Sequence, residues 1–262
     1  DLSYITDLTN VVYVHGAWLP ILWRAARRAR TIGARLIVRP AGSYDPLRLA
    51  YHRWRKRLVG PFEHWKLKTA DLVLAACPAE AEWIRAYEPE ACRIEVVDLK
   101  HFFNLSGNAP CRTIKKGNGH FLYLGRRHPL KGIEYLEEAI RRICAKKALT
   151  CDKDGNRIEL RVVSNAFGDE KEKIWEWCDT LVLPTLSENF GRVVAEALER
   201  GKRVITTDGA PAWGDGLAET DASFCTGYDG RLIFLKGYRA GTREKRVDLL
   251  ITALEENMKQ DG

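Results

Sequence analysis

Residues 183–196 read Leu-Pro-Thr-Leu-Ser-Glu-Asn-Phe-Gly-Arg-Val-Val-Ala-Glu, a run that leads from a strand through a loop into a helix. An apolar strand ends at Pro184, the loop carries Glu188, and the helix opens at Gly191. Free backbone N–H groups at a helix N-terminus attract anions, so the start of this helix is a candidate anion site. Glu188 and Glu196 can accept hydrogen bonds from hydroxyl groups of a sugar or a ribose. An isolated pair of such glutamates is more often a cap and a surface residue, but the strand–loop–helix context favours a binding site.

Short apolar strands and amphipathic helices alternate on both sides of this run. We expect strands at residues 10–15, 34–39, 71–76, 93–97, 120–125, 157–164, 180–184 and 202–207. We expect helices at residues 19–32, 79–87, 131–147, 169–177, 191–200 and 244–258, and a helical region over residues 46–68. This alternation predicts parallel sheets covered by helices on both faces. Ligands of such sheets bind outside the carboxyl ends of the strands.

A polar stretch divides the chain. Residues 104–119 contain Ser, Gly, Asn, Pro and Lys without an apolar period, which is typical of a linker. The sequence therefore predicts a first domain over residues 1–106, a linker over 107–118 and a second domain over 119–262. The last helix, 244–258, is a candidate for packing back on the first domain.

The composition excludes several classes of protein. The chain has 262 residues, 45% hydrophobic and 29% charged, which excludes a disordered or collagen-like protein. Its apolar runs are far shorter than the roughly 20 residues that cross a bilayer. The seven cysteines are odd in number and include no Cys-x-x-Cys pair. We therefore expect reduced, mostly buried thiols in a cytosolic protein, and neither a zinc ribbon nor a disulfide framework.

Positive charge is concentrated in residues 21–68, which hold thirteen Lys or Arg against Asp45 and Glu63. The whole chain has a formal net charge of +7. Large aromatic and aliphatic residues are interleaved with the cations of this segment, as in helices that lie at membrane interfaces. A solvated basic surface is an equally good interpretation. Our hypothesis is that residues 48–68 dock at an anionic membrane.

A second candidate site is Leu-Gly-Arg-Arg-His-Pro-Leu-Lys-Gly at residues 124–132, between a strand end and a helix start. Arg126 and Lys131 place two cations where phosphate groups could meet a helix N-terminus. The spacing is not that of a Walker loop, and the motif alone is weak. Together with Glu188 and Glu196 it predicts a nucleotide diphosphate at the strand ends, with cations on the phosphates and carboxylates on the hydroxyls.

These motifs together resemble the donor half of the GT-B glycosyltransferases of family 4. The resemblance is carried by Arg126 with Lys131-Gly132, and by Glu188-Asn-Phe-Gly and Glu196 with the Ala-Leu-x-x-Gly-x-Arg-Val-Ile that follows. Upstream it continues in His15-Gly-Ala-Trp18, Arg39-Pro-Ala-Gly-Ser43 and Ala70-Asp71, so that it covers nearly the whole chain. It implies an α/β protein with two Rossmann-like parallel-sheet domains that face a cleft. The start at Asp1, without a Met, implies that the opening of the first domain is missing.

The resemblance also implies a donor-binding set, made of cations for the diphosphate, a carboxylate for the ribose, and a carboxylate with backbone amides for the transferred sugar or its phosphate. By this resemblance, Arg126 and Lys131 would bind the diphosphate, and Glu196 would bind the ribose. Glu188, with Asn189, Phe190 and Gly191, would bind the transferred sugar or its phosphate. His15 would lie near the sugar as a catalytic residue together with Glu188, although a lone histidine at a strand end is more often structural. The turn from Gly209 to Trp213 either shapes the donor pocket or is a plain turn with a core tryptophan.

The remaining candidates lie on the acceptor or membrane side of the first domain. They are Arg39, Gly42, Arg53, Arg55, Lys56 and Arg57. Asp152-Lys-Asp154 superficially resembles a metal-binding pair, but the Gly-Asn that follows is more typical of a hairpin turn. No metal site is expected.

The function implied by the family is that of a retaining, metal-independent hexosyltransferase without a cofactor. It would move a sugar from a nucleotide-sugar donor to a glycan or glycolipid acceptor, in the synthesis of lipopolysaccharide, capsule or another cell-surface polysaccharide. We expect a cytoplasmic protein, peripheral at the inner face of the cytoplasmic membrane. No nucleic-acid partner is expected, because no reader motif is present. The alternative is a non-catalytic, membrane-associated partner of a glycan assembly complex with a degenerate GT-B fold.

Overall fold

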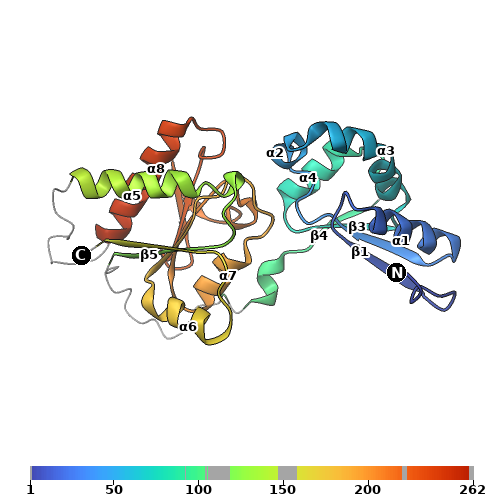
Figure 1. Ribbon diagram of the computed structural model, residues 1–262, viewed down its shortest axis with the longest axis horizontal. Coiled ribbons are helices and arrows are strands. Elements are labelled where there is room, and N and C mark those ends of the chain that lie inside the picture. The colour runs from blue at the N-terminus through green and yellow to red at the C-terminus, as the bar shows by residue number, and fades with distance from the viewer. Residues whose placement is uncertain are drawn as a thin grey trace. The chain divides into compact units, whose positions relative to one another are not determined.

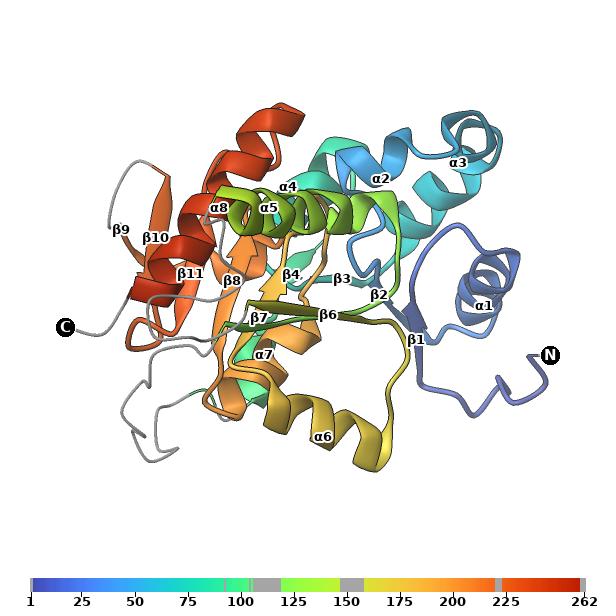
Figure 2. The ribbon, with the colours of Figure 1, turned by 60° about the vertical axis from the view of Figure 1, so that its left-hand side comes forward.

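The computed structural model describes residues 2–91, 93–103, 105, 119–146, 158–219 and 223–259 (Figures 1 and 2). The chain divides into two compact units, Asp1–Leu99 and Lys100–Gly262. The division falls before residue 106, the predicted end of the first domain. The predicted linker over residues 107–118 lies outside the described residues.

The first unit is a four-stranded parallel sheet with the strand order β1-β2-β3-β4. Its elements are β1 (Val11–His15), α1 (Pro20–Thr31), β2 (Arg35–Arg39), α2 (Pro46–Ala50), α3 (Arg53–Thr69), β3 (Leu72–Ala75), α4 (Pro78–Tyr87) and β4 (Ile94–Val96). Prolines open α1, α2 and α4, where the missing N–H costs nothing because the first helical N–H groups have no partner within the helix. The predicted α/β alternation is confirmed in this unit.

The predicted helical region over residues 46–68 is confirmed, and the structure divides it into two helices. The first, α2, ends at Ala50, and His52 takes the left-handed conformation with a φ of 54° before α3 begins. The Lys56 side chain reaches back to the Arg48 carbonyl, which also accepts a hydrogen bond from the Tyr51 amide at the end of α2. The break re-aims the chain between the two helices.

Among the described residues, the first sheet does not have the expected helical cover on both faces. Each strand is followed by its neighbour in the sheet, and right-handed crossovers between such strands all fall on one face. Figure 1 shows α1 to α4 on one side of this sheet. Val12 and Val14 point to the covered face and are buried, whereas Val11 and Tyr13 are each 50% exposed.

The second unit contains a seven-stranded sheet in the order β6-β5-β7-β8-β11-β10-β9. In chain order its elements are η1 (Leu99–Phe102), β5 (His120–Leu124), η2 (Pro129–Lys131), α5 (Ile133–Lys146), β6 (Glu159–Val163), α6 (Gly168–Trp177), β7 (Thr180–Leu183), α7 (Arg192–Glu199), β8 (Arg203–Thr207), η3 (Pro211–Trp213), β9 (Ala218–Glu219), β10 (Phe224–Gly227), β11 (Leu232–Leu235) and α8 (Arg243–Lys259). Every residue of β7 and β8 is buried, so these strands form the centre of the core.

This second sheet is mixed, whereas the sequence predicts a parallel one. The five strands β5, β6, β7, β8 and β11 are parallel to one another. Strand β10 runs antiparallel to both of its neighbours, β11 and β9. None of β9, β10 and β11 is predicted, because these strands are short and no helix separates them. An antiparallel pair needs only a short turn, here at Tyr228 to Arg231, so no crossover helix marks it in the sequence.

The last helix packs within its own unit. In Figure 1, α8 lies across α5, and Arg142 of α5 forms an ion pair with Glu244 of α8. Hydrogen bonds from Arg141 and Arg142 hold the pKa of Glu138 down to about 2 on the same surface. Packing of α8 on α5 is thus observed, and packing of the same helix on the first domain stays a prediction.

The cysteines in the described part of the chain are present as thiols. Cys77, Cys178 and Cys225 are buried, and Cys144 is half-buried. Burial raises the pKa of the Cys178 thiol to about 11. The expected burial is confirmed for three of these four, and Cys92, Cys111 and Cys151 lie outside the described residues.

Candidate functional site

Three loops of the second unit meet at the carboxyl ends of their strands. The loop after β7 is hydrogen-bonded on one side to the loop after β5, since the amide of Leu186 donates to the Leu130 carbonyl at 2.8 Å and the Thr185 hydroxyl donates to the same oxygen at 3.1 Å. On its other side the amide of Glu188 donates to the Gly209 carbonyl, in the loop after β8, at 2.7 Å. The loop that carries Glu188 is thus fixed from both sides, at the edge where such sheets bind ligands.

Two glycines permit this close approach. A Cβ atom on Gly132 would lie 2.1 Å from the Pro184 carbonyl oxygen, and one on Gly209 would lie 2.1 Å from that of Thr185. Gly132 also has a φ of 64°, which disfavours residues with a side chain. The backbone of 184–185 is therefore held between two positions where only glycine fits.

We expect Gly132→Ala to destabilise the second unit by about 2–4 kcal/mol, the sum of left-handed strain and overpacking. Gly201→Ala is a matched control, because Gly201 has a similar φ of 68° but nothing within 4 Å of its Cβ position. The control should lose only about 1–2 kcal/mol. Urea unfolding measures both values. Equal losses of stability in the two variants would contradict the close approach of Gly132 to the Pro184 carbonyl.

Lys131 and Glu188 are brought together at this edge. The Lys131 ammonium forms an ion pair with Glu188 Oε2, and the two side chains are only 17% and 20% exposed. Glu188 Oε1 accepts a hydrogen bond from the Asn189 amide at 3.1 Å. Asn189 Oδ1 is buried and has no donor among the described residues. In the ligand-free protein, Lys131, which we expect to bind a phosphate, thus neutralises Glu188, which we expect to bind a sugar.

Gly191 and Phe190 form the start of α7 next to this pair. Gly191 precedes the helix with a φ of 68°, and a Cβ there would lie 3.3 Å from both Glu188 Cγ and Leu183 Cδ2. The buried Phe190 is held by Trp213, whose indole N–H donates to the Phe190 carbonyl. Trp213 is 1% exposed, so the interpretation as a core tryptophan is confirmed. Through Phe190 this core residue fixes the backbone that leads into α7.

Glu196 and Arg126 lie further from the pair in the chain. Glu196 is on α7, and its Oε2 is 2.6 Å from the ammonium of Lys171 on α6. Arg126 is exposed in the loop after β5, where its carbonyl accepts a hydrogen bond from the Tyr123 hydroxyl at 3.0 Å. Both carboxylates that we expect to bind hydroxyl groups are therefore paired with a lysine.

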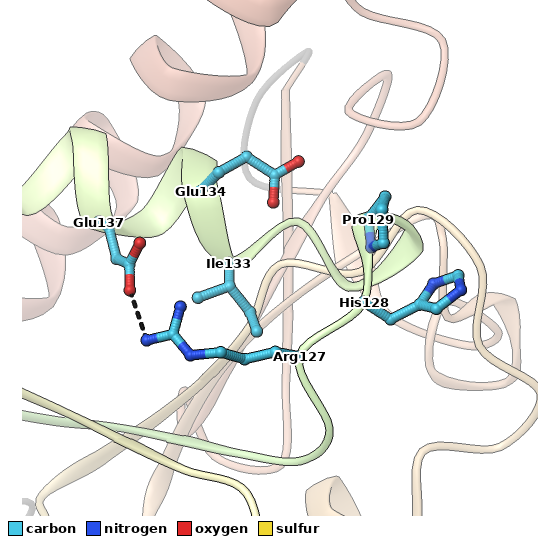
Figure 3. Close-up of a pocket in the computed structure, with 6 residues that line it drawn as sticks. All are labelled: Arg127, His128, Pro129, Ile133, Glu134 and Glu137. Atoms are coloured by element: carbon cyan, nitrogen blue, oxygen red, sulfur yellow. Dashed lines mark hydrogen bonds and ion pairs between the residues drawn. The ribbon is translucent and has the colours of Figure 1, made fainter.

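A pocket of about 310 Å³ opens beside the loop after β5 (Figure 3). Its lining residues are Arg127, His128, Pro129, Ile133, Glu134 and Glu137. Arg127 points across it to Glu137, with the guanidinium 2.8 Å from Oε1. Of the predicted cations, Arg126 directly precedes these residues in the sequence and Lys131 lies between Pro129 and Ile133.

The first unit places its predicted site residues at the carboxyl ends of β1 and β2. His15 and Arg39 are register partners at these strand ends, and His15 is exposed. Gly42 donates its amide to the buried Glu80, whose pKa is raised by burial. His15 belongs to a different unit from Glu188, and its catalytic role remains a prediction.

A buried charge pair in the first unit was not predicted. Glu63 and Lys66 of α3 are fully buried, with the ammonium 2.8 Å from Glu63 Oε2. Glu63 Oε1 also accepts from the amide of Trp18 at 2.7 Å, and Trp18 takes an unusual φ of 67° in the loop after His15. Burial lowers the pKa of Lys66, and Glu63 opposes that effect. One signal could have indicated this role, since Glu63 is one of two acids among thirteen cations in residues 21–68.

Metal ligands do not cluster in the part of the chain that the structure describes, where no group of three His, Cys, Asp or Glu side chains is placed to hold an ion. Asp152 and Asp154 lie outside this part. The expectation of a metal-free site therefore stays a prediction.

Both units match family models of glycosyltransferases. Residues 9–99 match the glycosyl transferase 4-like domain, and residues 118–225 match glycosyl transferases group 1. The two α/β units and the strand-end site thus define a GT-B glycosyltransferase. The chain belongs to this family, and the predictions of family and fold class are confirmed. Comparison with curated protein sequences gives no match.

Solved structures show the same fold at low sequence identity. The chain is similar to the apo structure of OtsA, with 12% identity, a TM-score of 0.62, and coverage of 99% of this chain and 67% of that one. It is similar to the α,α-trehalose 6-phosphate synthase of Burkholderia multivorans, with 10% identity, a TM-score of 0.60 and coverage of 99% and 66%. It is also similar to the sucrose-phosphate synthase of Thermosynechococcus elongatus, with 14% identity, a TM-score of 0.56 and coverage of 95% and 65%. The chain thus spans about two thirds of the length of these structures.

Proposed function

We propose that this glycosyltransferase moves a hexose from a nucleotide-sugar donor to a glycan or glycolipid acceptor, with retention of configuration and without a metal ion. The observation that carries the proposal is the junction of Lys131, Glu188 and the start of α7 on loops locked together at the strand ends. This junction offers a cation and helix-end amides to a diphosphate, and a carboxylate to sugar hydroxyls.

The charges of the reaction suit these groups. As the bond between the anomeric carbon and the phosphate oxygen breaks, negative charge grows on the diphosphate and positive charge on the sugar. Lys131, Arg126 and the amides of 189–191 would stabilise the leaving diphosphate. Glu188 would hold a sugar hydroxyl, and Glu196 a ribose hydroxyl. In this route the acceptor oxygen bonds to the anomeric carbon on the face that the diphosphate leaves, and its proton passes to the departing phosphate. His15 would lie near the sugar.

A thermal-shift panel of nucleotide sugars tests donor binding. A ligand that binds only the folded chain stabilises it by about 2.7 kcal/mol at a hundred times its Kd. We expect at least one nucleotide sugar to raise the melting temperature, and a nucleotide-free control such as galactose to leave it unchanged. A panel without any stabilising nucleotide sugar would contradict the proposed donor site.

The acceptor requires a separate assay. The solved structures of similar fold are named as trehalose-phosphate and sucrose-phosphate synthases, so soluble sugar phosphates are the comparison for a glycolipid acceptor. Once a donor is known, transfer to glycolipid extracts should exceed transfer to glucose 6-phosphate. Preference for the sugar phosphate would refute the role in cell-surface polysaccharide synthesis.

The membrane part of the proposal is supported by the surface of α3. Trp54, Leu58 and Phe62 are spaced four residues apart on this helix and are 63%, 70% and 55% exposed. The arginines at positions 53, 55 and 57 are exposed beside them. None of the helices in the described ranges is both long and apolar enough to cross a membrane. A basic helix with an exposed apolar stripe is suited to lie at an anionic surface.

Lys56 does not fit this surface as the sequence suggested. It is half-buried, it contacts the Arg48 carbonyl, and its ammonium lies 5.4 Å from the centre of the Trp18 ring. Burial lowers the pKa of Lys56, and the nearby Arg48 adds to this effect. The membrane test therefore uses the three exposed arginines alone.

We expect the charge reversal of Arg53, Arg55 and Arg57 to glutamate to abolish binding to vesicles that contain anionic lipid. Each cation near such a surface contributes about 1 kcal/mol, so the loss should exceed a hundredfold. The same reversal at Arg27, Arg35 and Arg85, which are exposed elsewhere in the first unit, is the matched control. Vesicle binding that survives the first change, or that both changes remove equally, would refute docking through α3.

A further inference from the structure

We propose that the Lys131–Glu188 ion pair makes the donor site prefer a nucleotide that still carries its sugar over the free diphosphate. The inference rests on the proposed function, because it assigns the phosphate to Lys131 and a sugar hydroxyl to Glu188. It concerns how these two residues act on each other, and it predicts a property that neither residue would give alone.

The pair is built into the loops and does not depend on flexible surface side chains. Lys131 ends η2, next to Gly132, and Glu188 follows a loop whose backbone is hydrogen-bonded on both sides. Less than a quarter of either side chain is exposed. Because both backbones are fixed, the pair exists before any ligand arrives. A phosphate that approaches Lys131 therefore meets a neutralised cation with a carboxylate beside it.

The consequence differs for the two ligands. With a nucleotide sugar, the phosphate replaces Glu188 as the partner of Lys131, and a sugar hydroxyl replaces Lys131 as a donor to Glu188. Both charged groups then keep a hydrogen-bond partner. With a free diphosphate only the first exchange takes place, so the Glu188 carboxylate loses its cation while an anion binds nearby, which is unfavourable.

Asn189 offers an independent observation in favour of a hydroxyl-bearing ligand. Its Oδ1 is buried without a donor among the described residues, directly after Glu188 in the chain. A buried acceptor without a donor is costly, and a sugar hydroxyl can donate to it whereas a diphosphate oxygen cannot. Two acceptors for hydroxyl groups, Glu188 and Asn189 Oδ1, thus follow each other in the chain, and Glu188 is the partner of Lys131. After transfer, the product diphosphate would be left with the weaker set of contacts and would leave.

The test measures the affinity of inorganic pyrophosphate by calorimetry at constant ionic strength. Glu188→Gln removes the competing charge and keeps the shape, so we expect pyrophosphate to bind about tenfold more tightly than to the parent chain, or ~1.4 kcal/mol. Glu137→Gln is the matched control, because it removes one negative charge and releases Arg127 in the same loop without touching Lys131. An equal gain in both variants, or no gain in Glu188→Gln, overturns the proposal.

Two further arms keep the result interpretable. If Glu188→Gln does not fold, Glu188→Asp withdraws the carboxylate by one methylene and should give a smaller gain, while an unchanged affinity overturns the proposal. When Lys131 is already replaced by alanine, Glu188→Gln should raise the affinity for pyrophosphate no more than Glu137→Gln does in the same variant. A full tenfold gain there would show that the pair is not the cause. The nucleotide-sugar panel reads the proposed donor function separately, since a chain can gain pyrophosphate affinity and still bind no nucleotide sugar.

Discussion

Replacing Lys131 with alanine is expected to lower the affinity of the nucleotide-sugar donor by about a hundredfold. A hydrogen bond to a charged group contributes about 1.5–3 kcal/mol, and each 1.4 kcal/mol is a factor of ten. The substitution removes the cation and also leaves the negative charge of Glu188, whose side chain is 20% exposed, uncompensated beside the diphosphate. Calorimetry with the donor found in the thermal-shift panel measures the change.

Lys173→Ala is the control for the Lys131 substitution. Lys173 is exposed on α6, so its loss changes the net charge of the second unit equally without altering the strand-end loops. We expect an affinity within a factor of two of the parent chain. If Lys131→Ala resembles this control, Lys131 does not bind the diphosphate and the assignment of the donor site is wrong.

Replacing Glu63 with glutamine is expected to destabilise the first unit by about 3–5 kcal/mol, the usual result of removing one partner of a buried ion pair. Lys66, which is 0% exposed, would keep its charge in the core without a carboxylate. The amide of Trp18 would also lose its charged acceptor, so the loop that follows His15 should loosen. Urea unfolding and limited proteolysis of the first unit measure these effects.

Two comparisons separate the buried pair from an ordinary salt bridge. Glu90→Gln breaks the exposed Lys68–Glu90 pair of the same unit and should cost less than about 1 kcal/mol. Glu63→Leu with Lys66→Met removes both charges and should recover part of the stability, since neither ion then remains unpaired. Equal unfolding curves for Glu63→Gln and Glu90→Gln would rule out the structural role of the buried pair.

Local pattern was enough to predict much of the fold. The apolar runs predicted β1 to β8 at nearly their observed positions, and the polar run after residue 104 predicted that the chain has two parts. The pattern did not predict β9, β10 and β11, because short strands joined by a tight turn carry no helical period between them. It also did not locate the break between α2 and α3 within the predicted helical region, since the left-handed conformation of His52 is not a preference of histidine.

The sequence did not predict which charged side chains pair with each other or are buried. Lys66 and Lys56 counted as members of a basic surface, yet one is fully buried and the other contacts the Arg48 carbonyl. The sequence indicated that Lys131 and Glu188 belong to one site, but it assigned them to different parts of a ligand. That they neutralise each other follows only from the meeting of the loops after β5 and β7.

The sequence by itself determined the order of the strands β1 to β8 and of the helices between them, the family, and which polar residues follow the strand ends. These properties depend on periodicity and residue type within a few neighbouring positions. The tertiary structure alone decided that the first sheet has helices on one face, that Glu63 is a buried anchor, and that Lys131 pairs with Glu188 across 57 positions of the chain. Such contacts are decided by sheet order and by the close approach of backbones at Gly132 and Gly209, which no local pattern records.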